Sequence, residues 1–166
     1  MGIDGLLIIL NLSKPSEVEV IELIKQYVCD YLSFLISKYG FSKGKEIYDD
    51  QSLSIEIRSN TFVVKIEKYR REIYITLFRP GYDENEIHLF NLIQYLFQKD
   101  NVSSNYFSEI EDLAECYRRQ IENSSTALKK YYEDIFHFFN VDDFRSQLEE
   151  VNRYMQERYP ELYKRR

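Results

Sequence analysis

Two histidines are the first residues in this chain of 166 that could do chemistry. His88 follows Glu84 by four positions, a spacing that places both side chains on one face of a helix. Glu133 and Asp134 likewise precede His137 by four and three positions. A metal site would need a third ligand from elsewhere, and the chain has no HExxH motif. The pattern therefore predicts surface ion pairs, with a small hydrolase or nuclease using Glu133, Asp134 and His137 as the enzymatic alternative.

Nucleophilic side chains have no activating pattern around them. Cys29 and Cys116 are the only cysteines, and neither belongs to a CxxC or Cys/His cluster. Both adjoin apolar or aromatic neighbours, which predicts small core or near-core residues whose pKa nothing nearby lowers. No serine lies in a GxSxG motif and no glycine-rich loop could hold a phosphate. We expect no catalytic, cofactor-binding or metal-binding residues, and isolated cysteines favour a cytoplasmic protein.

The composition is acidic and rich in aromatic residues. The chain carries 28 Asp and Glu against 22 Lys and Arg, a net charge of -6, which argues against binding to nucleic acid or an anionic membrane surface. It contains 15 tyrosines and 11 phenylalanines but no tryptophan. Tyrosine is common at protein interfaces, because it brings a large rigid contact area and a hydroxyl group. Mutational bias in an AT-rich genome is the alternative source of this excess.

The first half of the chain predicts one helix and a small antiparallel meander. Ser16 and Glu19 form a capping box before an apolar stripe of helical period, and Gly40 ends that helix. Apolar residues then alternate with polar ones in three segments, at 53–57, 62–66 and 73–77, and a fourth strand is an option at 45–48.

The second half predicts three helices. Asp83 and Glu86 form a second capping box before a stripe that ends near residue 97. A long helix follows at about 106–139, where Ser124 and Ser125 could bend or break it, and a last helix begins near residue 142 and ends before Pro160. The fold class is α+β, a meander of three or four strands packed with an N-terminal helix and three C-terminal helices. We expect one domain over 1–166, with a C-terminal helical hairpin at 105–166 as a possible subdomain.

Partner-binding candidates lie on the meander and in the acidic clusters. The outward positions of the meander include Val63, Tyr74 and Phe78, so that face is only partly polar. The acidic clusters would attract a basic partner, although those at helix starts also suit the helix dipole. The predicted partner-binding residues are Tyr69, Tyr74, Asp49, Asp50, Glu109, Glu111 and Asp112.

Part of the chain, from Tyr31 to Leu77, resembles a known group of proteins. A helix ending in Leu-Ile-Ser-Lys-Tyr-Gly-Phe is followed by short strands of the form Ser-Leu-Ser-Ile-Glu-Ile-Arg and Glu-Ile-Tyr-Ile-Thr-Leu. This order is similar to small bacterial toxin-immunity-type and uncharacterised cytosolic proteins encoded near polymorphic toxins. The resemblance implies a cytosolic protein that blocks a toxin by covering its surface, and it assigns no functional residue.

The sequence therefore predicts a non-catalytic protein-binding domain, such as an immunity or inhibitor protein that neutralises a toxin or another partner by surface occlusion. We expect a protein partner with a basic surface, no nucleic acid, no membrane and no cofactor. The enzymatic alternative is the carboxylate–histidine site named above. A structural alternative is an assembly protein that homodimerises through its C-terminal helices.

Overall fold

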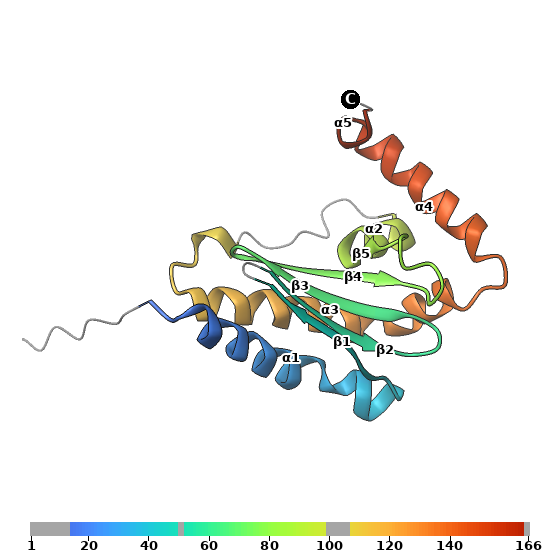
Figure 1. Ribbon diagram of the computed structural model, residues 1–166. Helices are drawn as coiled ribbons and strands as arrows, with labels where there is room; N and C mark the ends of the chain where they lie inside the picture. The colour runs from blue at the N-terminus through green and yellow to red at the C-terminus, as the bar shows by residue number, and fades with distance from the viewer. Residues whose placement is uncertain (1–13, 50–51, 99–106, 165–166) are drawn as a thin grey trace, which may run out of the picture.

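The structure, a computed structural model, describes residues 14–49, 52–98 and 107–164, and its architecture confirms the α+β class (Figure 1). In the described residues five strands form the sheet, where three or four were predicted. The elements follow in this order: α1 (Glu17–Tyr39), β1 (Ser42–Tyr48), β2 (Ser52–Arg58), β3 (Val63–Tyr69), β4 (Glu72–Phe78), β5 (Ile87–His88), α2 (Leu89–Phe97), the 3-10 helix η1 (Phe107–Glu109), α3 (Leu113–Phe139), α4 (Phe144–Arg158) and α5 (Pro160–Tyr163).

Helix α1 begins and ends where the sequence predicts. The Ser16 hydroxyl accepts a hydrogen bond from the Glu19 backbone and the Glu19 carboxylate accepts one from the Ser16 backbone, so the capping box forms. Gly40 closes the helix in the left-handed conformation, with φ of 72°. Its N–H donates to the Ile36 carbonyl, and the chain turns directly into β1.

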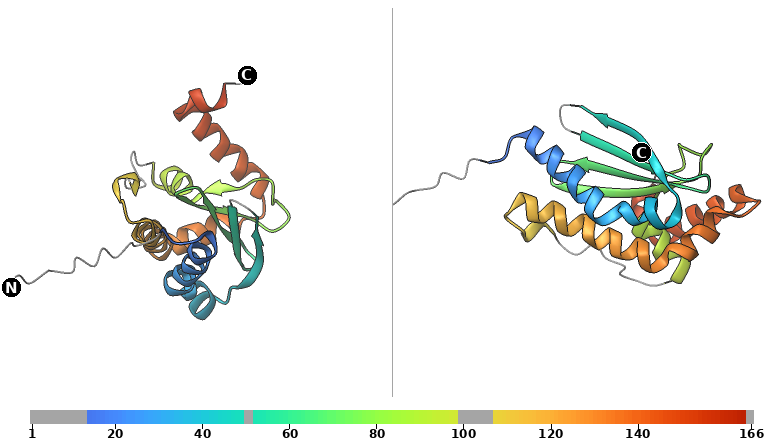
Figure 2. Two further views of the ribbon diagram at one scale, coloured as in Figure 1. Left: turned by 60° about the vertical axis from the view of Figure 1, so that its left-hand side comes forward. Right: turned by 90° about the horizontal axis from the view of Figure 1, so that it is seen from below.

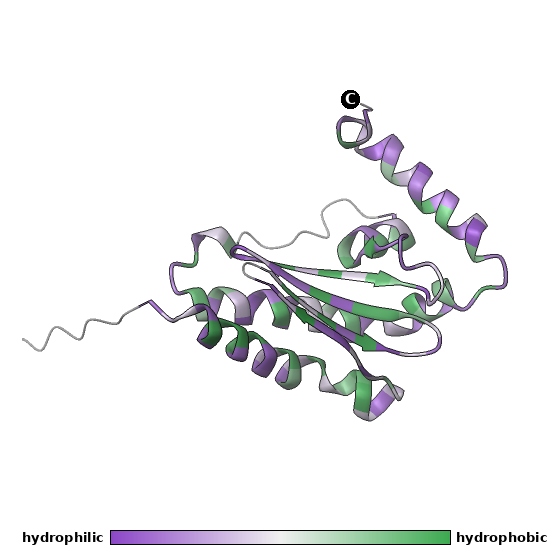
Figure 3. Ribbon diagram, in the orientation of Figure 1, coloured by the Kyte–Doolittle hydropathy of each residue, from purple (hydrophilic) through white to green (hydrophobic). Residues whose placement is uncertain are grey.

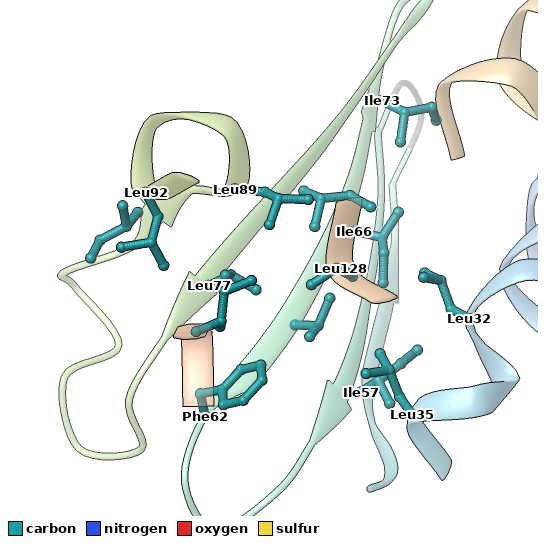
Figure 4. Packing of buried hydrophobic residues seen from close by; sticks show 14 of the residues in the cluster. Leu32, Leu35, Ile57, Phe62, Ile66, Ile73, Leu77, Leu89, Leu92 and Leu128 are labelled. Atoms are coloured by element: carbon teal, nitrogen blue, oxygen red, sulfur yellow. The ribbon is translucent and has the colours of Figure 1, made fainter. Parts of the chain in front are cut away.

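The sheet is an antiparallel meander in the order β1-β2-β3-β4-β5. Helices α1 and α3 lie side by side on one face of it, as the two views of Figure 2 show. Because side chains alternate along each strand, one apolar set faces these helices. Figure 4 shows Ile57, Ile66 and Leu77 of the sheet meeting Leu32 of α1 and Leu128 of α3 in the buried core.

Helix α3 begins at Leu113, later than the predicted residue 106, and continues through its two serines. Ser124 and Ser125, expected to bend or break the helix, are buried within it, and the Ser125 hydroxyl donates to the Tyr31 carbonyl of α1 at 2.6 Å. The distortion lies instead at Tyr131, where the backbone leaves helical values with φ of -109° and ψ of 15°. The two serines therefore allow close contact between α1 and α3.

The predicted capping box at Asp83 and Glu86 is wrong. Residues 87 and 88 form the short strand β5 on the edge of β4, and α2 begins only at Leu89. Glu86 instead accepts hydrogen bonds from Lys65 at 2.8 Å and from Thr76 at 3.0 Å. The Glu86 carboxylate, which the local pattern assigned to a helix start, thus binds Lys65 of the sheet instead.

The apolar side chains on the sheet face away from α1 and α3 are mostly buried. Val63 and Phe78, two of the apolar outward positions, are buried, and the Arg58 guanidinium lies 5.9 Å from the Phe78 ring centre. Lys65 bridges Glu67 and Glu86 across the same face. Only Tyr74 of the three apolar positions keeps a partly exposed ring.

Helix α4 leaves the layered body and projects beside α2 (Figures 1 and 2). Hydrophilic residues predominate along this helix (Figure 3), while Phe144 and Leu148 are buried at its base. The Tyr159 hydroxyl donates to the Gln94 side chain at 2.9 Å, and the Tyr95 ring packs edge-on against Tyr154. Aromatic contacts and side-chain hydrogen bonds therefore hold α4 to α2.

Gly44 offers a test of the packing of the outer face. A Cβ atom there would lie 2.6 Å from the Arg58 Cγ and Cδ atoms, closer than side chains approach one another. We expect Gly44→Ala to lower the free energy of unfolding by roughly 1–3 kcal/mol, as overpacking does. In an Arg58→Ala background the same change should cost much less, and chemical denaturation of the four proteins measures the difference. Equal losses in both backgrounds would contradict the packing.

Candidate functional site

A cleft of about 840 Å³ opens between the edge of β4, the start of α2, η1 and the first half of α3. Four aromatic rings line it, those of Tyr69, Tyr74, Phe90 and Phe107. The remaining walls carry polar or charged side chains from the turn between β3 and β4, from β5, from η1 and from α3. The size and the mixture of rings with a few polar groups are typical of ligand-binding and partner-binding clefts.

The turn that forms one wall has a constrained backbone. Arg70, at its tip, has a φ of 54°, a left-handed value that is costly for a residue with a side chain. The Tyr117 hydroxyl of α3 donates to the Arg70 carbonyl at 2.6 Å, and the Arg71 guanidinium donates to the Ile110 carbonyl. Helix α3 and the segment before it therefore fix this turn in place.

Gln120 of α3 fastens the neighbouring edge of β4. Its side-chain oxygen accepts from the Ile73 N–H at 2.9 Å, and its nitrogen donates to the Arg71 carbonyl at 2.9 Å. A neighbouring strand would offer the same pair of groups, but β5 pairs with β4 only at residues 76 and 77. One side-chain amide thus completes the sheet edge, and the space that a further strand would fill becomes the cleft.

Several polar groups of the cleft have no partner within the described structure. Ser124 has 5% of its surface exposed and Asn123 lies beside it on α3, and neither side chain makes a hydrogen bond to the described residues. The His88 imidazole likewise has ring contacts only, with Tyr74 at 6.4 Å and Phe90 at 5.9 Å between centres. Ser124 is buried, whereas Asn123 and His88 are half-buried, so the polar atoms of all three side chains are available to a bound partner or to water.

His88 is neutral near pH 7. Burial lowers the pKa of its imidazole below the usual 6.5, because the aromatic surroundings solvate the cation poorly. A neutral imidazole has one donor and one acceptor nitrogen, so His88 can pair with either kind of group.

The structure brings five of the seven predicted residues to this end of the molecule. Tyr69 and Tyr74 line the cleft. Glu109 ends η1, and Glu111 and Asp112 follow it, with Asp112 capping α3 by accepting from the Glu115 N–H at 2.7 Å. All three carboxylates are exposed. The acidic cluster therefore has a structural role at Asp112 and also lies close to the aromatic cleft.

The other two predicted residues lie outside the cleft. Asp49 directly follows β1, and its carboxylate accepts hydrogen bonds from the Ser52 backbone N–H at 3.1 Å and from the Ser52 hydroxyl at 2.8 Å, which ties the end of β1 to the start of β2. The register pairs Ser52 with Tyr69, so this turn lies at the same end of the sheet as the cleft. Asp50 lies outside the described residues.

The residues of the enzymatic alternative do not form a site. Glu133, Asp134 and His137 are exposed on the C-terminal half of α3. Across the described residues, no three His, Cys, Asp or Glu side chains come together as metal ligands would. Glu84 and His88 share no helix, since both precede α2. The predicted helical pairing of these two residues is therefore wrong.

The cysteines differ from each other. Cys116 is buried, as predicted, and its thiol donates to the Phe107 carbonyl at 3.4 Å, a contact that requires the protonated form. Cys29 is exposed, so its prediction as a core or near-core residue is wrong. It follows the buried Val28 on α1 and lies beside the buried stripe of that helix, on its exposed side.

Several cleft residues have no signal in the sequence. Gln120, Asn123 and Ser124 lie in an ordinary helical stretch, and their importance depends on the edge of β4, 47 residues away in the case of Gln120 and Ile73. The sequence signal that lies nearest to this site is the pair Arg70 and Arg71, in a two-residue turn between two segments of alternating residues. It marks the hairpin and not the residues of α3.

Comparisons with known proteins add no assignment. The chain matches no family model. No curated protein and no solved structure shows significant similarity to it either. In the described parts of the chain, no helix has the length and apolar character that crossing a membrane requires. The site must therefore be interpreted from its own geometry.

The Gln120 contact can be tested by substitution. Gln120→Leu leaves the buried Ile73 N–H without a partner and leaves the Arg71 carbonyl only the Cys116 thiol at 4.0 Å, which should lower the free energy of unfolding by roughly 1–3 kcal/mol, the cost of an unsatisfied buried backbone group. Gln156→Leu, at an exposed position of α4, is the matched control and should change stability by less than about 0.5 kcal/mol. Urea denaturation measures both, and similar values for the two variants would contradict the role of Gln120.

His88 should make stability depend on pH. Its pKa is lowered in the folded state, so the unfolded chain binds the proton first as pH falls through 6.5. The stabilisation is therefore complete above that value and declines as pH falls below it. We expect His88→Phe to remove part of the decline between pH 7 and pH 5, measured by urea denaturation across that range. An unchanged slope in the variant would show that His88 does not contribute.

Proposed function

We propose that this protein is a non-catalytic protein-binding domain that binds its partner through the cleft beside β4. The observation that carries the proposal is one cleft that combines four aromatic rings with the side chains of His88, Asn123 and Ser124, none of which has a hydrogen-bond partner among the described residues. The rings supply contact area, and the polar groups without partners can form hydrogen bonds with a protein that brings the matching donor or acceptor.

Rigidity of the cleft supports the same proposal. The turn at Arg70 and the edge of β4 are both fixed by side chains of α3, so the backbone that carries Tyr69 and Tyr74 is held in place before a partner binds. A preformed surface loses less entropy on binding than a mobile one. Binding domains gain affinity from such pre-organisation without needing any reactive group.

Charge around the cleft favours a partner with a basic surface. The exposed carboxylates of Glu72, Glu109, Glu111 and Asp112 lie at or near its rim, against the two arginines of the turn. Arg71 is engaged with the Ile110 carbonyl, and the Arg70 guanidinium lies 5.2 Å from the Tyr69 ring centre. A lysine or arginine of the partner could reach the carboxylates while its stem packs on the rings.

The finer proposal, an immunity or inhibitor protein that occludes a toxin in the cytoplasm, rests on the resemblance of residues 31–77 described above. A domain of this kind neutralises its target by covering it, and so needs a rigid complementary surface but no catalytic group. The enzymatic alternative has less support, because its carboxylates and histidine lie exposed on one helix with no third ligand among the described residues.

Homodimerisation through the C-terminal helices keeps one specific observation in its favour. Leu162 and Tyr163 of α5 are exposed apolar side chains at the tip of the projecting α4 and α5 arm. Light scattering at micromolar concentration distinguishes this alternative, since a strictly monomeric protein excludes a stable dimer.

Affinity capture from the native host tests the proposed function. We expect wild-type protein to retain a specific partner, and the pair of changes Tyr69→Ala and Tyr74→Ala to reduce retention at least tenfold, because hot-spot rings often contribute 2 kcal/mol or more each. Tyr163→Ala is the matched control, with 45% exposure against 47% for Tyr69. A partner retained equally by the cleft variant, or activity lost on changing His137 alone, would contradict the proposal.

A further inference from the structure

A second surface lies at the opposite edge of the sheet from the cleft. A groove of about 410 Å³ runs between α1 and the strands β1 and β2. Val28, Leu32 and Ile36 of α1 and Ile55 of β2 make its lining largely apolar. Glu46 of β1 spans the groove to Lys25 of α1, with 2.5 Å between Oε1 and Nζ. The groove is therefore an apolar channel whose outer wall is the first strand of the sheet.

The outer wall presents unpaired backbone groups. Strand β1 pairs with β2 only, and no described residue pairs with its other side. The Asp49 N–H donates to the Ser52 carbonyl, so alternation directs the Ile47 backbone toward β2 and the backbones of Glu46 and Tyr48 outward. Two residues thus offer N–H and carbonyl groups to an incoming strand beside an apolar groove.

The rim of the groove is basic in an acidic protein. Lys43 and Lys45 of β1 are exposed, and neither makes an ion pair with any described residue. The chain as a whole has a net charge of -6, so two unpaired lysines on one strand mark a local reversal of sign. The groove therefore complements an apolar segment that carries carboxylates.

We propose that an extended, acidic segment of another protein binds along β1 as an added strand. Its backbone pairs with the outward groups of Glu46 and Tyr48, alternate apolar side chains enter the groove over Leu32 and Ile36, and its carboxylates meet Lys43 and Lys45. This surface is separate from the cleft and does not depend on the function proposed for it.

A second copy of this chain is the competing occupant of this edge. Antiparallel pairing of β1 with itself through Glu46 and Tyr48 would set Lys45 of one copy opposite Asp49 of the other. Lysines on an exposed edge strand commonly discourage pairing with neutral or basic strands. An added acidic strand would engage both Lys43 and Lys45, and light scattering distinguishes it from a dimer.

The probe is a fluorescein-labelled peptide of eight residues that alternates glutamate and valine, with a lysine–valine peptide of equal length as its counterpart. Fluorescence anisotropy should detect binding of the acidic peptide and at least tenfold weaker binding of the basic one. The double change Lys43→Glu and Lys45→Glu should weaken binding of the acidic peptide at least tenfold. Lys129→Glu with Lys130→Glu, on exposed α3 positions, makes the same change in net charge and should leave binding within twofold.

Backbone pairing has its own test. Tyr48→Pro removes an outward N–H at an edge position that tolerates proline, whereas Tyr48→Ala removes only the ring. We expect the proline variant to bind the acidic peptide at least fivefold more weakly than the alanine variant, with circular dichroism and thermal unfolding showing that both are folded. Tyr74→Ala, in the cleft, should not alter binding of the peptide.

Four results would overturn the proposal. They are failure of the acidic peptide to bind at millimolar concentration, equal binding of the two peptides, binding by the Lys43→Glu and Lys45→Glu variant that matches the wild type, and a dimer in light scattering that this double variant abolishes. The last result would assign the edge to a second copy of the chain.

Discussion

The arrangement of this protein depends on how the backbone at the edge of β4 is satisfied. Buried peptide groups must be hydrogen-bonded, and β5 covers only part of this strand. Gln120 of α3 supplies the missing donor and acceptor, while Tyr117 and Cys116 bind the carbonyls of the adjoining turn and η1. Because side chains complete the edge where a strand could have done so, a cleft lined by rings remains open beside it.

The position of α3 is fixed by a second set of contacts on its other side. Arg118 reaches the Tyr31 hydroxyl of α1 at 2.8 Å and binds Glu115 and Glu122 of its own helix. The hydrogen bonds from Arg118 and Arg119 lower the pKa of Glu115 to about 2, so its carboxylate stays charged through the physiological range. Helix α3 thus connects α1 to the edge of the sheet at β4. The edge at β4 and the opposite edge at β1 have different surfaces.

Those surfaces have opposite character. The cleft beside β4 combines rings with nearby carboxylates, whereas the groove beside β1 combines aliphatic side chains with lysines. The protein could therefore hold two partners, or two segments of one partner, at opposite edges of one rigid sheet. The net charge of the whole chain does not reveal this difference, because it sums the charges of both edges.

Local patterns predicted the parts of the fold that local forces determine. The capping box at Ser16, the glycine closure at Gly40 and the alternation of the meander all depend on residues within a few positions of each other. The same reasoning failed at Glu86, because Lys65 and Thr76 reach that carboxylate from the sheet. Tyr69 and Tyr74 were identified as candidates from their strand positions.

The rest of the site could not be predicted in this way. Gln120 matters only because it meets Ile73, and no rule of spacing links two residues so far apart in the chain. The exposure of Cys29 depends on a small rotation about α1 that periodicity does not resolve. Long-range contacts and helix rotation are thus the two sources of error in the sequence analysis.

Backbone hydrogen exchange with and without the captured partner tests the central claim, that the cleft beside β4 is where a protein partner binds. Our account predicts slower exchange in the complex at residues 69–75 and 107–112, with no change at 129–137 on the exposed half of α3. Protection confined to 129–137, around His137, would contradict the account and move the functional site to the carboxylate–histidine surface.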